Sequence, residues 1–102
     1  MTDDTLEPGG DLAGRDLRDR TLAGAPLQEA TLADADLREV TLGDVDLRGA
    51  DLTDARLDRV TCSGFLSEAE LTDASLVDAD FRRVDLSDAT LTGADLRRVD
   101  LR

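Results

Sequence analysis

The stretch from Ala30 to Val60 reads ATLAD ADLRE VTLGD VDLRG ADLTD ARLDR V, and its apolar residues recur with a period of five. Leucine takes every fifth position, at Leu32, Leu37, Leu42, Leu47, Leu52 and Leu57. Alanine or valine lies two residues before each leucine, and the positions between are polar or small. The fold must therefore place two apolar positions of every five-residue unit on one side of the chain.

A five-residue period fits neither an α-helix nor a single β-strand. A helix advances roughly 100° per residue, so successive leucines would lie about 140° apart around its axis. In a strand, side chains alternate between faces, so residues five apart point to opposite faces. The chain must instead turn once per unit. A stack of such units, each too small to bury its own apolar pair, is a solenoid.

The repeated units resemble the A(D/N)LXX motif of the pentapeptide-repeat family. The closest matches are ADLRE (35–39), ADLTD (50–54), ADFRR (79–83) and ADLRR (94–98), and the resemblance runs from Gly10 to Arg102. It implies an all-β fold, a right-handed quadrilateral parallel β-helix in which each pentapeptide forms one side and twenty residues form one coil. Residues 10–102 then make a single solenoid domain of about 4–5 coils.

Two places depart from the strict repeat. Residues 1–9 are an acidic N-terminal lead-in that contains Pro8 and Gly9. This lead-in is either a loose tail or a plug in which Leu6 covers the first coil. The second departure is a register slip near 61–66, where TCSG is one residue short and the next central position falls at Leu66. A tightened corner or a small bulge at Gly64 accounts for it.

The composition excludes several classes of function. The net charge is −12 and every basic residue is arginine, which argues against direct binding to nucleic acid or to an anionic membrane. The chain has no histidine, and its single cysteine, Cys62, falls at a central core position. The sequence therefore predicts no enzyme, no cofactor and no metal site. Nothing in it resembles a signal peptide or a membrane span, which favours a cytoplasmic location.

If the twenty-residue coil persists through the slip, the central residues sort into four faces. Face one contains Leu12, Leu32, Leu52, Leu71 and Leu91, and face two contains Leu17, Leu37, Leu57, Leu76 and Leu96. Face three contains Leu22, Leu42, Cys62, Phe81 and Leu101, and face four contains Leu27, Leu47, Leu66 and Leu86.

The outward charges differ between these faces. Face two nearly balances its acids with arginines, whereas the adjacent faces one and four carry many acids opposed only by Arg48. We therefore predict a partner-binding surface on faces one and four, called the acidic ridge. Its members are Glu29, Asp34, Asp46, Asp51, Asp54, Glu68, Glu70, Asp73 and Asp88.

The acidic ridge predicts a non-catalytic module that binds a protein partner with a basic surface. Some acidic pentapeptide-repeat proteins act as DNA mimics on type II topoisomerases and confer antibiotic resistance, so the resemblance implies DNA gyrase as the most specific partner. This sequence shows no C-terminal helix of the kind that pairs two such rods. The alternative is a structural or scaffolding rod without DNA mimicry, engaging partners through the neutral, arginine-rich face two or through the open end of the rod.

The C-terminal coil suggests self-association. Its apolar residues Phe81, Leu91, Leu96 and Leu101 would lie beside unpaired strand edges if no further coil covers them, and such edges invite pairing. The sequence thus predicts a homodimer formed end to end through this coil.

Overall fold

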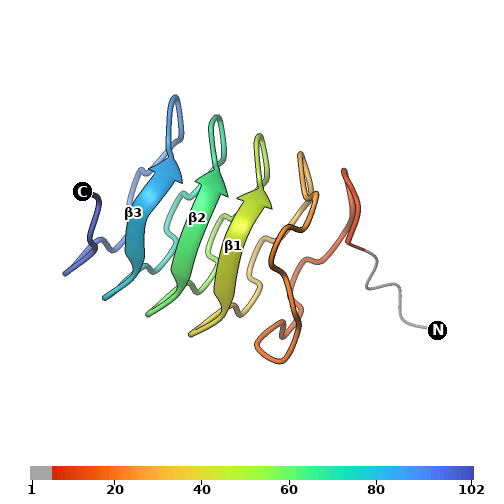
Figure 1. Cartoon of the computed structure of the whole chain (residues 1–102), viewed down its shortest axis with the longest axis horizontal. Coiled ribbons are helices and arrows are strands. Elements are labelled where there is room, and N and C mark those ends of the chain that lie inside the picture. The colour runs from red at the N-terminus through yellow and green to blue at the C-terminus, as the bar shows by residue number, and fades with distance from the viewer. Residues whose placement is uncertain (1–5) are drawn as a thin grey trace.

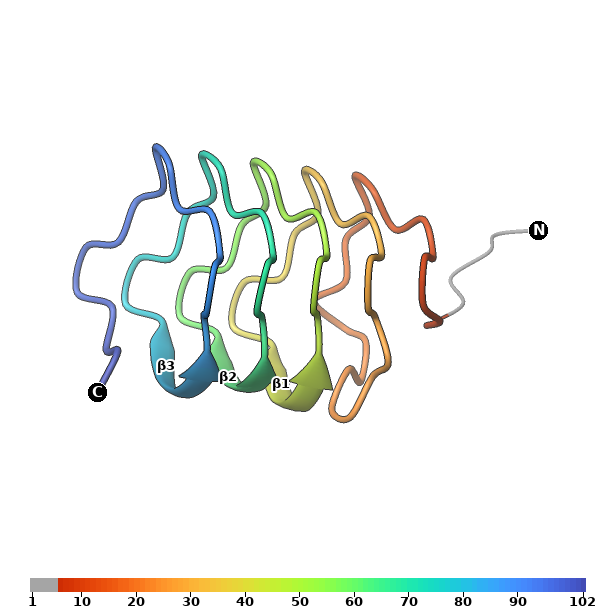
Figure 2. The ribbon, with the colours of Figure 1, turned by 90° about the horizontal axis from the view of Figure 1, so that it is seen from above.

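The computed structural model describes residues 6–102 as a stack of similar coils. Three strands on one side form a parallel sheet in the order β1-β2-β3: β1 (Thr41–Asp46), β2 (Thr61–Phe65) and β3 (Asp80–Asp85). Each strand belongs to a different coil, and Figures 1 and 2 show the coils following one another along the long axis. The Cα atoms extend 39 Å along this axis and 22 and 21 Å across it.

The hydrogen-bonded register gives the length of each coil directly. Asp11 pairs with Thr31 and Thr31 pairs with Asp51, which is a step of 20 residues. Asp51 then pairs with Glu70, a step of 19, and Glu70 pairs with Thr90, again a step of 20. The coil therefore persists through the slip, and the all-β parallel solenoid is confirmed. The right hand of the helix and the number of its coils stay predictions.

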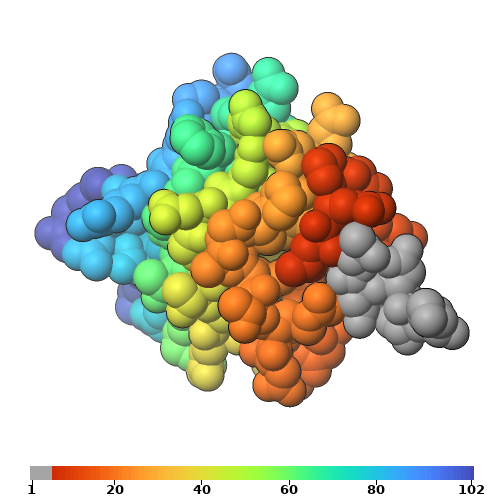
Figure 3. Space-filling model, turned by 45° about the vertical axis from the view of Figure 1, so that its right-hand side comes forward, coloured from red at the N-terminus to blue at the C-terminus, as the bar shows by residue number. Residues whose placement is uncertain are grey.

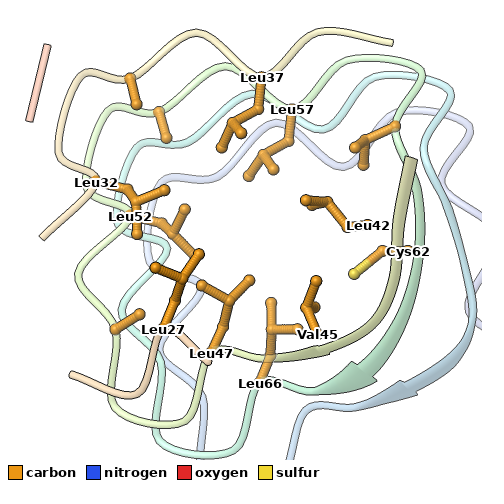
Figure 4. Packing of buried hydrophobic residues seen from close by; sticks show 14 of the residues in the cluster. Leu27, Leu32, Leu37, Leu42, Val45, Leu47, Leu52, Leu57, Cys62 and Leu66 are labelled. Atoms are coloured by element: carbon orange, nitrogen blue, oxygen red, sulfur yellow. The ribbon is translucent and has the colours of Figure 1, made fainter. Parts of the chain in front are cut away.

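Columns of leucine fill the centre of the stack. Figure 4 shows Leu32 beside Leu52, Leu37 beside Leu57 and Leu27 beside Leu47, all pointing inward from equivalent places in successive coils. The central leucines from Leu12 to Leu76 are at most 2% exposed, and no polar or charged side chain among the described residues is buried. Burying one leucine stabilises a fold by roughly 1.5–3 kcal/mol, so the columns dominate the stability of the stack.

Tight turns separate the sides of each coil. In the turn after Leu32, the Leu32 carbonyl accepts a hydrogen bond from the Ala35 amide (3.0 Å), and Asp34 has a φ of 62°. A positive φ at the third residue alone defines a type II turn, which glycine adopts most easily. Among residues 6–102, eleven non-glycine residues have positive φ, at a cost of about 1–2 kcal/mol each. Hydrogen bonds between coils, such as Asp34 N to Thr53 O (2.9 Å), offset this cost.

The slip is a coil that lacks one outward residue. Leu42 pairs with Cys62, but Val45 pairs with Gly64, so β1 carries one extra residue opposite β2. The same mismatch recurs between β2 and β3, where β3 carries the extra residue. Both interpretations of the slip therefore apply: the corner in β2 is one residue short, and β1 and β3 bulge opposite it. The Ser63 hydroxyl replaces the missing backbone acceptor and receives the Asp44 amide hydrogen at 2.8 Å.

The lead-in contacts the first coil over the part that is described. Residues 1–5 lie outside the described residues. Gly9 donates a hydrogen bond to the Gln28 carbonyl (2.8 Å), and Leu6 is half-buried against the core. For Leu6 the plug hypothesis fits better than the loose tail. In the space-filling view the first coils form one continuous surface with those that follow (Figure 3).

Gly64 generates the first testable prediction. Its φ is 122°, and a Cβ atom there would overlap the backbone oxygen and nitrogen of Val45. Gly64→Ala should therefore lower the free energy of unfolding by about 2–4 kcal/mol, measured by urea denaturation. Gly43→Ala is the matched control, because nothing lies within 4 Å of the added methyl group. Equal losses in the two variants would contradict this description of the slip.

Candidate functional site

Six of the twelve arginines, all of which lie within residues 6–102, are held by an aspartate two residues earlier. Because the intervening residue points inward, the two flanking side chains leave the same side of the strand. In the Asp36–Arg38 pair, Asp36 Oδ1 accepts from the Arg38 backbone amide (3.2 Å) and Nε (2.9 Å), and Oδ2 accepts from Nη2 (2.7 Å). The same pairing occurs at Asp16–Arg18, Asp46–Arg48, Asp80–Arg82, Asp95–Arg97 and Asp100–Arg102.

Further ion pairs join neighbouring coils. Arg59 reaches Glu39 at 2.9 Å, and Arg98 reaches Asp78 at 2.7 Å, in each case from one coil to the previous one. All four residues lie on face two, together with three of the local Asp–Arg pairs. Exposed pairs of this kind stabilise by only about 0–1 kcal/mol each. Their main effect here is that the charge of face two is neutralised locally.

The carboxylates of face one lie in two columns that contain no arginine. Asp34, Asp54 and Asp73 occupy the left-handed turn position of successive coils, and Asp54 N donates to Thr72 O in the next coil (2.9 Å). Asp51 and Glu70 pair directly across the coil boundary at the other edge of the face. Asp34, Asp54, Glu70 and Asp73 are exposed and Asp51 is partly exposed. The structure thus brings these five predicted residues together.

Three more predicted acids border this surface. Glu29, Glu68 and Asp88 take the turn position of face four, with φ near 60°, and a single alanine separates each from the first outward residue of face one. Glu68 and Glu70 flank Ala69 in this way. Eight members of the predicted acidic ridge therefore follow face one and the corner that it shares with face four.

Asp46 does not belong with the other eight. It lies at the opposite edge of face four, next to face three, and Arg48 holds it with contacts of 2.8 and 2.6 Å. The pKa of Asp46 is lowered, chiefly by the side-chain hydrogen bonds from Arg48. We therefore remove Asp46 from the acidic ridge, which from here on means the remaining eight residues. Its charge is already neutralised by the local Asp–Arg motif.

Phe65 is a surface residue that the sequence analysis passed over. It is 53% exposed at the start of face four, and the Arg48 guanidinium carbon lies 5.9 Å from the centre of its ring. The signal was present in the sequence, because the equivalent positions of the neighbouring coils hold Asp46 and Asp85. A phenylalanine at an outward position breaks the polar pattern.

The predicted self-association residues are only partly exposed. Phe81 is 2% exposed because the last coil covers it, with Phe81 N donating to Asp100 O at 2.8 Å. Its assignment to the exposed end was therefore wrong. Leu91 is half-buried, whereas Leu96 and Leu101 are 37% and 52% exposed. Only these two leucines offer a substantial apolar surface at that end.

Metal-binding clusters and reactive thiols were the remaining candidates for a chemical site among the described residues. Residues 6–102 contain no cluster of three or more His, Cys, Asp or Glu side chains placed to bind a metal. Cys62 is buried, and loss of hydration raises the pKa of its thiol to about 12, with a smaller contribution from Asp80. Such a thiol stays protonated and unreactive at neutral pH. The same residues include no helix able to cross a bilayer.

The family follows from a direct match to the repeat. The model of the family described as pentapeptide repeats (8 copies) matches residues 16–54, 25–64 and 66–102. The chain belongs to the pentapeptide-repeat family. No curated protein matches the sequence closely.

Solved structures of other pentapeptide-repeat proteins share the fold. HetL, involved in heterocyst differentiation regulation in the cyanobacterium Nostoc sp. strain PCC 7120, is 33% identical, with a TM-score of 0.88 over 92% of this chain. This pentapeptide-repeat protein spans less than half of HetL, 46% of its length. A protein from the Arabidopsis thaliana thylakoid lumen is 33% identical, with a TM-score of 0.71 over 92% of this chain and 70% of its own. Rfr23 from Cyanothece 51142 is 23% identical, with a TM-score of 0.65 over 95% of this chain and 80% of its own, and it supports the fold alone.

The Asp–Arg motif generates a pH prediction. Hydrogen bonds from the Arg82 side chain and backbone lower the pKa of Asp80 to about 2. A lowered carboxyl pKa stabilises the fold above the unfolded value of about 3.9, and this stabilisation is lost as the pH falls through about 2. Carboxyl ¹³C NMR titration should show the low pKa in the native protein and a value nearer 3.9 in Arg82→Gln.

Arg83→Gln is the control for this titration. Arg83 contributes only a weak electrostatic effect on Asp80 and donates no hydrogen bond to it. The pKa of Asp80 should therefore change little in this variant. A pKa that is the same in Arg82→Gln and in the native protein would refute the proposed cause.

Proposed function

We propose that this protein is a non-catalytic, cytoplasmic protein-binding module whose acidic ridge engages a basic surface on a protein partner. The observation that carries the proposal is the separation of charge between faces. Arginine neutralises face two through local and inter-coil pairs, whereas the face-one column that holds Asp34, Asp54 and Asp73 contains no arginine. The arginine that follows it along the chain, Arg56, already occupies the first outward position of face two. A potential concentrated on one surface accelerates association with a partner of opposite charge.

The sharpest form of this proposal is DNA mimicry on a type II topoisomerase, with DNA gyrase as the target and antibiotic resistance or self-protection as the outcome. Parallel strands repeat about every 4.8 Å, so the ridge presents a carboxylate at regular short intervals along the rod. Duplex DNA likewise presents closely spaced negative charges along its axis. The right-handed helix of about 4–5 coils that we propose would keep these columns nearly parallel to the rod axis.

A gyrase supercoiling assay tests the target and the surface together. The native protein in molar excess should inhibit supercoiling or protect the enzyme from a gyrase poison, and added salt should weaken the effect because it screens exposed charges. The variant Asp51→Asn/Asp54→Asn/Asp73→Asn should lose most of the effect. No effect of the native protein at large excess would remove gyrase as the target.

A second triple variant controls for net charge. Asp19→Asn/Glu39→Gln/Asp78→Asn changes the charge by the same amount, at the turn position of face two and outside the acidic ridge. It should retain the activity of the native protein. Equal losses in the two triple variants would show that overall charge, and not the ridge, carries the effect.

The alternative function is a scaffolding rod that binds partners through face two. The inter-coil pairs Arg59–Glu39 and Arg98–Asp78 favour it, because they give this face a fixed pattern of alternating charges. Binding through a neutral, prepaired surface would depend little on salt. Partners retained equally at low and high salt would therefore support the scaffold over the ridge.

We also propose that the C-terminal coil forms a homodimer, supported by the exposure of Leu96 and Leu101. Sedimentation of the 102-residue chain at high micromolar concentration should show a dimer, and Leu96→Asp/Leu101→Asp should show a monomer. Phe65→Asp, which removes a comparably exposed apolar side chain elsewhere, should remain dimeric. A native protein that stays monomeric at that concentration would contradict the proposal.

A further inference from the structure

Phe65 is an exposed apolar side chain on a surface whose other outward residues are mostly polar or charged. Among the described residues only three large apolar side chains are exposed, and the other two, Leu96 and Leu101, are inward-column residues of the last coil. Phe65 instead takes an outward position in the middle of the rod, between Asp46 and Asp85 of the adjacent coils. No requirement of the core accounts for a phenylalanine there, since the same position accepts aspartate in both neighbours.

The short coil opens space on one side of the Phe65 ring. Beside this coil, an open recess of about 480 Å³ lies next to the ring. Its lining includes Asp44, Ser63, Gly64, Arg82 and Arg83. Two aspartates, Asp44 and Asp85, balance the two arginines of the recess, so its net charge is zero. Phe65 and Val84 supply the apolar part of its lining, and this part favours an apolar occupant.

The other side of the ring is held in place. The Arg48 guanidinium lies 5.9 Å from the ring centre, within the range of a cation–π contact, and Asp46 fixes Arg48 with two hydrogen bonds. The ring is therefore oriented before any partner arrives. An aromatic side chain fixed in this way loses little conformational entropy on binding, which is a property of strong interface contacts.

The opposite edge of face four carries part of the acidic ridge. Glu29, Glu68 and Asp88 line this edge, about one side of a coil away from Phe65. Between them and Arg48 lies a second open recess of about 460 Å³, lined by Gln28, Gly49 and Ser67 as well as by Glu29 and Glu68. Face four thus presents an apolar contact and an acidic edge within the reach of one short peptide segment.

We propose that face four is a docking surface for a protein segment in which one large apolar side chain lies within a few residues of a cluster of basic residues. Phe65 and the neutral recess contact the apolar side chain, and Glu29, Glu68 and Asp88 pair with the basic residues. The inference rests on the proposed function, since it assumes a basic partner, and it adds a feature that selects among basic partners. Charge alone attracts any cationic surface, whereas Phe65 distinguishes those with an apolar group at the right distance.

Two synthetic peptides test the proposal: Trp-Gly-Gly-Lys-Lys-Lys and Gly-Gly-Gly-Lys-Lys-Lys. The protein has no tryptophan or tyrosine, so the fluorescence of the first peptide reports its binding, and the second is measured by competition. The first peptide should bind the native protein on the order of tenfold more tightly than the second. In Phe65→Ala this advantage should disappear, while affinity for the second peptide stays unchanged.

Two further variants separate the anchor from folding and from charge. Phe65→Asp copies the residue of the neighbouring coils, so it keeps the fold, and it should also lose the tryptophan advantage. Thr61→Ala, an outward change on face three, should keep it. Equal affinities of the two peptides for the native protein would overturn the role of Phe65 and leave the acidic ridge standing. Failure of both peptides to bind at low salt would overturn the ridge and the anchor together.

Discussion

Everything in this structure depends on the hydrogen bonds between successive coils, which require each residue to lie directly above its counterpart. Leu32 N bonds to Asp51 O and Leu52 N bonds to Glu70 O, both at 2.7 Å, so the leucines must stack. The stacked leucines also exclude water from the interior of the solenoid and fix the spacing of the coils. The unfavourable turn conformations of residues such as Asp34 persist because the surrounding ladder determines them.

This arrangement separates folding from surface chemistry. Two positions in five point into the interior of the solenoid and determine stability. The residues at the outward positions vary between repeats without disturbing this core. Acids, threonine, proline, arginine and phenylalanine all occur at the position before a central residue. Charge can therefore be distributed face by face. Because ion pairs neutralise the charges of face two, the net charge of −12 is spread unevenly over the four faces.

The sequence predicted the features that follow from periodicity and missed those that follow from individual neighbours. The five-residue period was sufficient to predict the columns, including the stacking of Leu52 on Leu71 through the slip. It was insufficient for Asp46, because its neutralisation depends on the geometry that places Arg48 two residues later on the same side of the strand. Phe81 was misplaced because the last coil, in which Asp100 pairs with Asp80, covers it.

The slip shows how a local loss of regularity produces a new surface. Removing one outward residue shortens the coil to 19 residues. Three local features accommodate the loss: the absence of a side chain at Gly64, its φ of 122°, and the Ser63 hydroxyl, which accepts the Asp44 amide hydrogen in place of a backbone carbonyl. A coil of regular length would need none of them. Sites that depart from the rules of a fold are where functional demands are expected to appear. The exposed Phe65 ring lies directly beside these adjustments, so the irregular coil and the aromatic contact form one feature.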